Sequence, residues 1–178
     1  MAMSIKNILI TGTPGVGKTT LVKKIVEKLR PLRPVGFYTG EIREGGARKG
    51  FTLTAPDGRA SILSHVDIKS PHRVGRYGVD VAGFERFLDT LDFSDPVNLV
   101  AVIDEIGKME CFSEKFKRLV RDILDSDKYV IATIALKGGG FIGEIKARKD
   151  IVVYEITFRN RDSLLSEIIK SIGLPLEE

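Results

Sequence analysis

The sequence predicts an α/β fold of three layers, in which helices cover both faces of a mostly parallel β-sheet. Segments of strand length alternate along the chain with segments whose apolar residues recur at helical spacing. The strand segments are almost continuously apolar, which is typical of strands that are buried on both faces. The chain has 178 residues and contains no repeat or long linker, so we expect one domain over residues 1–178.

The first elements follow this alternation. Residues 5–11 form an isoleucine-rich strand before a glycine loop, and residues 18–30 form a helix with one apolar face. Pro31 and Pro34 end this helix, and residues 35–39 begin a second strand. The order strand, helix, strand indicates that the two strands are parallel.

An insertion is expected at about 38–64, next to the second strand. Two turn signals, Gly45-Gly46 and Asp57-Gly58, separate short runs of β-prone residues there. These runs predict an antiparallel β-meander at one edge of the main sheet.

The rest of the chain returns to alternating strands and helices. Ser113 is in position to cap the helix that follows it, and Gly173 and Pro175 end the last helix. We expect an irregular stretch at 65–80, helices near 83–91, after 113, near 141–148 and near 161–172, and strands at 98–104, 129–135 and 151–156.

Composition and charge narrow the class of protein. Hydrophobic residues make up 43% and charged residues 29%, a normal globular mixture. The net charge of +4 suits a polyanionic ligand such as a nucleotide. Cys111 is the only cysteine, which excludes an intrachain disulfide and indicates a reducing compartment. The sequence has neither a secretory signal pattern nor an apolar run of membrane-spanning length, so a cytoplasmic protein is expected.

A phosphate-binding motif follows the first strand. Residues 12–19 read GTPGVGKT and match G-x-x-x-x-G-K-[ST] in full. The motif lies between a predicted strand and a predicted helix, where backbone N–H groups and the positive end of the helix can face phosphates. Lys18 is expected to reach the β- and γ-phosphates, and the Thr19 hydroxyl to ligate Mg²⁺. The motif therefore predicts a site for a nucleoside triphosphate with magnesium.

An acidic pair follows a later buried strand. The apolar run 99–103 leads directly into Asp104 and Glu105. Asp104 is expected to hold Mg²⁺, directly or through its water ligands. Glu105 can lie near the γ-phosphate and activate a water for in-line attack. A positioned base favours hydrolysis, although some kinases also carry carboxylates at this place.

With these two motifs, the chain resembles the small stand-alone P-loop nucleoside-triphosphatase family, the family of the human cancer-related nucleoside-triphosphatase. The resemblance spans nearly the whole chain. It rests on GTPGVGKTT at 12–20, GFYTGEIREGGARKGF at 36–51, RVGRYGVD at 73–80, VIDEIGKME at 102–110 and RKDIVVYEIT at 148–157, with Asn160 and Arg161 after it. The second and fourth segments are far more specific than the first, which many unrelated proteins share.

The resemblance implies a RecA-like core with an added β-hairpin. It also implies hydrolysis of ATP, GTP, CTP and UTP to the diphosphate and phosphate, with loose base selectivity and Mg²⁺ as cofactor. Lys18 and Glu105 are the expected catalytic residues, and Thr19 and Asp104 the expected metal ligands. We expect a monomer that requires neither a membrane nor a nucleic acid. The expected nucleotide-binding residues are Gly12, Thr13, Pro14, Gly15, Val16, Gly17, Lys18, Thr19, Thr20, Val100, Ala101, Val102, Ile103, Asp104, Glu105, Ile106 and Gly107.

An additional positive charge near the γ-phosphate would stabilise the transition state. The candidates in this chain are Arg73, Arg76, Arg148, Arg161 and Lys108, each of which can also be a solvated surface charge. Another protein or protomer can supply such a charge instead.

Three further residues have two interpretations each. Thr133 could contact the γ-phosphate or be an ordinary strand residue. Glu110, together with Lys108, could orient the segment after Glu105 or form an exposed ion pair. Tyr77 lies in a predicted loop and could stack on a base or pack elsewhere.

The sequence also allows two other functions. A nucleoside or nucleotide kinase would suit the phosphate loop, but the region at 135–150, where such kinases carry an arginine-rich lid, contains little arginine. A nucleotide-gated RNA-binding module would use a basic face on or just beyond the first helix. The basic residues there, which can equally be the solvated side of that helix, are Lys23, Lys24, Lys28, Arg30 and Arg33.

Overall fold

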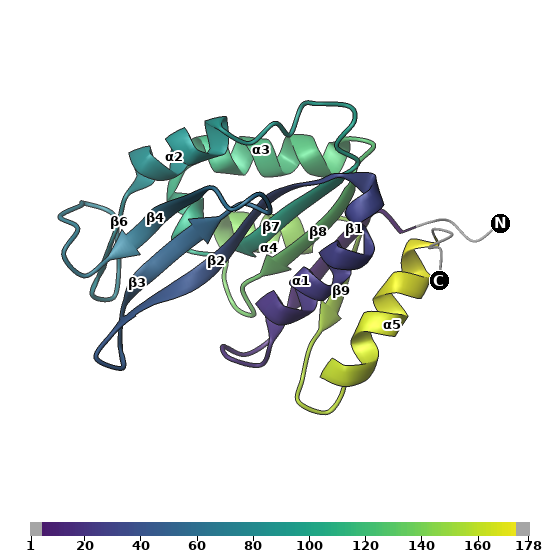
Figure 1. Cartoon of the computed structure of the whole chain (residues 1–178), viewed down its shortest axis with the longest axis horizontal. Helices are drawn as coiled ribbons and strands as arrows, with labels where there is room; N and C mark the ends of the chain where they lie inside the picture. Colours follow the sequence, from purple (N-terminus) through teal and green to yellow (C-terminus); the bar gives the residue numbers. More distant parts are fainter. Residues whose placement is uncertain (1–4, 174–178) are drawn as a thin grey trace.

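The computed structural model of the chain describes residues 5–173, with a nine-stranded sheet at its centre (Figure 1). The strands lie in the order β5-β6-β4-β3-β2-β7-β8-β1-β9. Their bounds are β1 (Asn7–Thr11), β2 (Pro34–Glu44), β3 (Ala47–Thr54), β4 (Ala60–His65), β5 (Arg73–Val74), β6 (Tyr77–Val79), β7 (Val100–Ile106), β8 (Tyr129–Ile134) and β9 (Ile151–Glu155). The helices are α1 (Lys18–Lys28), α2 (Val81–Asp89), α3 (Glu114–Asp125), α4 (Gly140–Lys146) and α5 (Arg161–Ile172), with 3₁₀ turns η1 (Arg30–Leu32) and η2 (Glu110–Phe112).

One side of the sheet consists of parallel strands. β2 pairs in parallel with β7, β7 with β8, β8 with β1, and β1 with β9. The side chains of β1, β7 and β8 are almost all buried, as continuous apolar runs predict. Because parallel strands end at the same edge of a sheet, the loops that follow β1, β7 and β8 meet there. The predicted α/β fold with a mostly parallel sheet is confirmed.

The other side of the sheet is antiparallel. β2 continues past its pairing with β7 and pairs with β3, which pairs with β4, and β4 pairs with β6. The added antiparallel strands therefore extend the main sheet at its β2 edge. The stretch 65–80, expected to be irregular, contains the short strands β5 and β6. Strands of two and three residues are too short to produce a recognisable alternation in the sequence, which explains the difference.

Helices cover both faces of the parallel strands, which gives the three layers (Figure 1). α1 and α5 pack against one face around Ile8 and Ile10, and α2, α3 and α4 pack against the other around Leu9, Phe37 and Ile103. Successive residues of a strand point to opposite faces, so β1 contributes to both cores. Within residues 5–173, none of the helices has the length and apolar character that crossing a bilayer requires.

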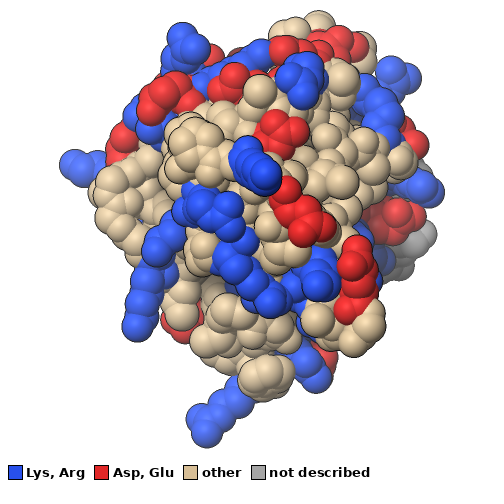
Figure 2. Space-filling view, turned by 90° about the vertical axis from the view of Figure 1, so that its left-hand side faces the viewer, with Lys and Arg blue, Asp and Glu red and all other residues tan. Residues whose placement is uncertain are grey.

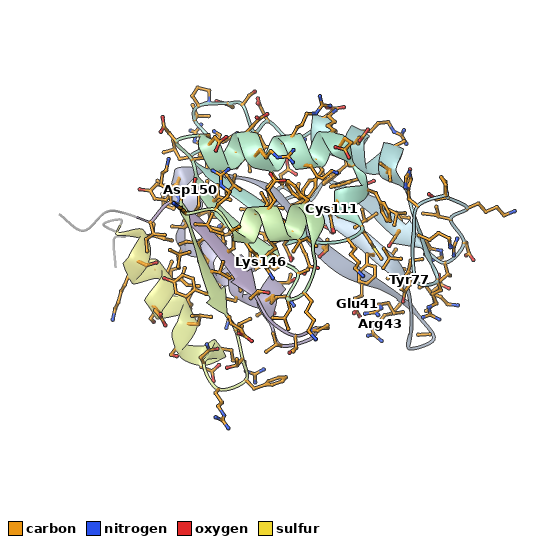
Figure 3. All side chains as sticks on the ribbon, turned by 180° about the vertical axis from the view of Figure 1, so that it is seen from behind. Glu41, Arg43, Tyr77, Cys111, Lys146 and Asp150 are labelled. Carbon is orange, nitrogen blue, oxygen red and sulfur yellow. The ribbon has the colours of Figure 1, made fainter. Side chains whose placement is uncertain are left out.

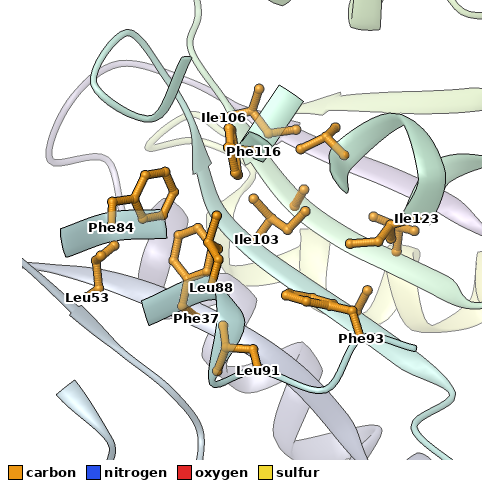
Figure 4. Close-up of a cluster of buried hydrophobic side chains, with 14 of the residues drawn as sticks. Phe37, Leu53, Phe84, Leu88, Leu91, Phe93, Ile103, Ile106, Phe116 and Ile123 are labelled. Atoms are coloured by element: carbon orange, nitrogen blue, oxygen red, sulfur yellow. The ribbon is translucent and has the colours of Figure 1, made fainter. Parts of the chain in front are cut away.

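Phe37 lies at the centre of the larger core (Figure 4). Its side chain is fully buried, and its ring centroid lies 5.8 Å from that of Phe84 and 6.3 Å from those of Phe87 and Phe116. Phe84 and Phe87 belong to α2, and Phe116 belongs to α3. A single side chain of β2 therefore packs against two helices, α2 and α3.

Replacing Phe37 by Ala is expected to lower the free energy of unfolding by about 3–5 kcal/mol, because it removes a large buried ring and leaves a cavity. Urea unfolding followed by circular dichroism measures this change. The matched control is Phe158→Ala, since the Phe158 side chain is 68% exposed. An equal loss in both variants would contradict the assignment of Phe37 to the core.

Candidate active site

A cleft of about 840 Å³ lies at the carboxyl edge of the parallel strands. Its walls come from the phosphate loop after β1, the segments that follow β7 and β8, and the hairpin of β2 and β3. Parallel strands deliver their following loops to this edge, which is where open α/β sheets bind ligands. Of the predicted nucleotide-binding residues, the cleft is lined by Gly12, Pro14, Gly15, Gly17, Lys18, Thr19, Thr20, Asp104 and Glu105.

The phosphate loop turns directly from β1 into α1. Gly17 precedes the helix with φ 111°, a left-handed conformation that a residue with a Cβ rarely adopts. No side chain caps the N-terminus of α1, an 11-residue helix, so the N–H groups of its first turn are available to an anion. The loop thus has the form that binds phosphate.

Lys18 is folded back across this loop. Its Nζ donates a hydrogen bond to the Gly12 carbonyl at 2.7 Å and to the Thr13 carbonyl at 3.2 Å. These two carbonyls hold the ammonium group at the border of the cleft, where a bound phosphate can compete for it.

Asp104 is a buried carboxylate, and each of its oxygens accepts a hydrogen bond from a threonine hydroxyl. Its side chain is only 2% exposed. Thr19 Oγ1 donates to its Oδ2 at 2.7 Å, and Thr133 Oγ1 donates to its Oδ1 at 2.6 Å. Burial raises the pKa of Asp104, while the two hydroxyl hydrogen bonds oppose that rise. Thr133 is therefore more than an ordinary strand residue, because it holds the Asp104 carboxylate in place.

The pairing of Thr19 with Asp104 suits a hard divalent cation. A hydroxyl oxygen and a carboxylate oxygen lie together beside the phosphate loop, and oxygen ligands are those that Mg²⁺ prefers. Within residues 5–173, no cluster of three or more His, Cys, Asp or Glu side chains forms a metal site. A cation at Thr19 and Asp104 would therefore need further oxygen ligands from phosphate or water.

Glu105 extends into the same cleft, next to Asp104. Burial raises the pKa of its carboxyl group, the nearby Lys18 lowers it, and the Asp104 charge raises it further. Gly107 leaves room for this side chain, because a Cβ at Gly107 would come within 2.7 Å of Glu105 Oε1 and 3.0 Å of Glu110 Oε2. The end of β7 and the segment that follows it thus bring two carboxyl groups close to Gly107.

Glu110 is a buried acid behind Glu105. It is 5% exposed, and burial together with the Glu105 charge raises its pKa to about 8. Backbone N–H groups of Gly107 and of Glu110 itself favour its charged form and oppose that rise. An exposed ion pair with Lys108 is therefore ruled out. The alternative, that Glu110 orients the segment after Glu105, agrees with these contacts.

Several predicted nucleotide-binding residues lie outside the cleft wall. Ile103 and Ile106 of β7 are fully buried, and Val16 packs in the core between the sheet and α1. The side chains of these residues pack in the core and do not line the cleft. The predicted residues that do not line the cleft are Thr13, Val16, Val100, Ala101, Val102, Ile103, Ile106 and Gly107.

The arginines considered as additional charges have other partners. Arg73 donates hydrogen bonds to the Ile68 and Arg76 carbonyls, and Arg76 to the Arg48 carbonyl. Arg161 follows β9 and stacks over Phe158, its Cζ 5.4 Å from the ring centroid. None of the three lines the cleft, whereas Lys108 does.

Arg148 lies far from the site. It forms ion pairs with Asp125 and Asp150, both at 2.6 Å. Asp150 precedes β9, at the edge of the sheet opposite the cleft, and Figure 3 shows it at the other end of the molecule from Glu41. Arg148 therefore stabilises the turn before β9 and takes no part in the cleft.

Tyr77 is not a loop residue that could stack on a base. It lies in β6, is 8% exposed, and its ring packs edge-on against the ring of Phe51, with the two centroids 5.5 Å apart.

The sequence analysis did not identify Glu41 and Arg48, which both line the cleft. A signal for them was present, because the Gly45-Gly46 turn folds the segment 36–51 back on itself.

Comparisons with known proteins identify the family of the chain. A model of the NTPase family matches residues 7–169. The chain is 46% identical to a protein of Thermotoga sp. (strain RQ2) named nucleoside-triphosphatase THEP1, over 91% of this chain and 92% of that protein. It is 41% identical to the cancer-related nucleoside-triphosphatase of Homo sapiens, over 94% and 96%. The crystal structure of THEP1 from the hyperthermophile Aquifex aeolicus has a TM-score of 0.85 and 40% identity, covering 94% of this chain and 99% of that one. The chain therefore belongs to the NTPase family, the nucleoside-triphosphatase family that its motifs predict.

Proposed function

We propose that this protein is a Mg²⁺-dependent nucleoside-triphosphatase that hydrolyses ATP, GTP, CTP and UTP to the diphosphate and phosphate. One observation carries the proposal: the Glu105 carboxyl group lies in the same cleft as the phosphate loop, beside Lys18. A base next to the γ-phosphate position can activate a water molecule for attack. Water is then the phosphoryl acceptor, and the reaction requires no other acceptor. The names of the relatives support triphosphate hydrolysis and specify no base.

The phosphate chain is bound by backbone and charge. The N–H groups of the loop and of the first turn of α1 surround the β- and γ-phosphates. Lys18 exchanges its two loop carbonyls for phosphate oxygens. Thr19 and Asp104 would hold Mg²⁺, which when bound neutralises charge on the β- and γ-phosphate oxygens.

Glu105 acts as the general base. As the oxygen of a water forms a bond to the γ-phosphorus, the water gives a proton to the Glu105 carboxylate. The bond between the γ-phosphorus and the bridging oxygen breaks, and the diphosphate leaves with the electron pair. Burial raises the pKa of Glu105 and so makes it a better proton acceptor than an exposed glutamate, while the nearby Lys18 opposes that rise.

We also propose that residues 1–178 act as one domain, with the segment 38–64 as an insertion that belongs to the site. The support is the continuous sheet, which joins the antiparallel strands to the parallel ones through β2. The cleft takes residues from both parts, so neither part alone contains the whole cleft wall.

Phosphate release from ATP, GTP, CTP and UTP with Mg²⁺ tests the proposed activity. Wild type is expected to hydrolyse all four, and Glu105→Gln to turn over ~10²–10⁴-fold more slowly with nucleotide binding retained. Lys18→Ala is the inactive control. Wild type that binds nucleotide, releases no phosphate and transfers the phosphoryl group to an added nucleoside or monophosphate would point to a kinase and contradict the proposal.

The buried Glu110 is expected to make stability depend on pH. Its pKa is about 8 in the folded protein, against an ordinary value of 4.5, so the folded state retains a proton that the unfolded state has lost. Its contribution to stability is therefore complete below about pH 4.5 and is lost as the pH rises toward 8. At about 1.4 kcal/mol for each pKa unit, the loss amounts to a few kcal/mol.

Urea unfolding of wild type and Glu110→Gln at several pH values measures this effect. The variant stays neutral at every pH, so its stability relative to wild type should increase steadily between about pH 5 and pH 8. A difference between the two proteins that is constant across this range would show that Glu110 is not protonated in the folded state.

A further inference from the structure

The cleft contains one arginine among the residues within 5–173 that line it, namely Arg48. Arg48 lies near the start of β3, just after the Gly45-Gly46 turn. Its Nε donates to the Tyr77 hydroxyl at 3.0 Å, and its Nη1 donates to Glu41 Oε1 at 3.0 Å. The guanidinium also stacks on two rings, its Cζ 5.1 Å from the Phe51 centroid and 5.7 Å from that of Tyr77. Two rings and two hydrogen bonds therefore fix its position before any ligand arrives.

One nitrogen of Arg48 remains available. Within residues 5–173, Nη2 has no hydrogen-bond partner, while Nε and Nη1 each have one. The Arg48 side chain is 42% exposed, so the free nitrogen can reach a ligand in the cleft. A planar guanidinium held in this way can offer its remaining N–H groups to a phosphate oxygen without losing its anchors.

Glu41 does not need Arg48 to remain paired. Arg43 donates to Glu41 Oε2 from Nε at 2.8 Å and from Nη2 at 2.7 Å, while Arg48 uses the other oxygen. Hydrogen bonds from Arg48 and Arg43 lower the pKa of Glu41, which keeps its carboxylate ionised. Figure 3 shows Glu41, Arg43 and Tyr77 side by side at the hairpin end of the sheet. Arg43 and Arg48 therefore share the Glu41 carboxylate, and Nη2 of Arg48 is available while its Nη1 keeps the hydrogen bond to Glu41.

The surroundings favour a negatively charged ligand at this place. Figure 2 views the molecule from the side of the hairpin and of β6, and lysine and arginine side chains form a band across that face. Arg43 and Arg76 belong to the same region but have backbone or carboxylate partners and do not line the cleft. Arg48 is thus the member of this group that faces the triphosphate site.

The strand order places β7 between the phosphate loop and the hairpin of β2 and β3. The phosphate loop follows β1, and Asp104 and Glu105 lie near the carboxyl end of β7. β2 is the next strand in the sheet after β7, and its hairpin partner β3 carries Arg48. Glu105 on β7 and Arg48 on β3 therefore line the same cleft from two strands that flank β2.

We propose that Arg48 is a catalytic residue that donates Nη2 to a γ-phosphoryl oxygen and stabilises the charge of the transition state. Lys18 contributes from the phosphate loop, and Arg48 contributes from the hairpin side of the transferred γ-phosphoryl group. The bonds formed and broken are those of the hydrolysis described above, so this inference rests on the proposed function. It supplies within one chain the positive charge that some related enzymes take from a partner protein.

Two matched variants test the role of Arg48. Arg48→Met deletes the guanidinium but keeps an apolar side chain packed on Phe51 and Tyr77. Arg43→Met deletes the other arginine that pairs with Glu41, and Arg43 does not line the cleft. Arg48→Met is expected to lower kcat ~10²–10³-fold while the dissociation constant of the nucleotide changes by less than about tenfold. Arg43→Met is expected to stay within about threefold of wild type in both. Thermal unfolding of both variants confirms that they are folded.

Binding of a transition-state mimic supplies a second measurement that does not depend on turnover. ADP with Mg²⁺ and aluminium fluoride imitates the planar phosphoryl group, and wild type should bind it more tightly than ADP alone. Arg48→Met should lose that gain and Arg43→Met should keep it, with equal affinity of all three proteins for ADP. In Arg48→Ala, added guanidinium ion should restore part of kcat.

The outcomes separate this inference from the proposed function. If Arg48→Met hydrolyses nucleotide and binds the mimic like wild type, Arg48 is only part of a solvated ion pair. If both variants lose activity equally, the hairpin matters as a structure and Arg48 has no individual role. If wild type itself releases no phosphate, the proposed function is wrong. Binding of the mimic then still shows whether Arg48 contacts the planar aluminium fluoride group.

Discussion

The arrangement of the site depends on the hydrogen bonds that the Asp104 carboxylate accepts from two threonine hydroxyls. This carboxylate stands at the end of β7, one oxygen bonded to Thr19 at the start of α1 and the other to Thr133 on β8. Removing a carboxylate from water costs several kcal/mol unless hydrogen bonds compensate it, and two hydroxyl groups do so here. Three separate segments are thereby held at one point, which fixes the phosphate loop relative to Glu105.

β2 connects the hydrophobic core with the cleft. Phe37, Thr39 and Glu41 alternate along this strand and so lie on the same face of the sheet. Phe37 anchors the strand between α2 and α3, whereas Thr39 and Glu41 line the cleft. Because one strand belongs to both regions, the position of the antiparallel hairpin depends on packing in the core. The insertion is therefore a structural part of the site and not an appended element.

The sequence predicted the parallel core, the phosphate loop and the acidic pair because each produces a local pattern of apolar runs, glycines or charges. It could not reveal that Glu110 is buried, since a glutamate after a strand ordinarily faces water. Arg48 escaped notice for a different reason. The Gly45-Gly46 turn indicates that β2 and β3 pair, but it does not give their register. That register shifts between Ile42 and Arg43, and a bulge of this kind has no reliable sequence pattern.

Calorimetry of a non-hydrolysable nucleoside triphosphate, with and without Mg²⁺, tests the central role of Asp104 most directly. Asp104→Asn keeps the size of the side chain but removes the charge beside the Thr19 hydroxyl. Mg²⁺ is expected to strengthen binding to wild type and to give little or no gain in Asp104→Asn, with similar affinities of both proteins in the absence of the metal. An undiminished Mg²⁺ effect in the variant would contradict the account, since the cation would then be held without Asp104.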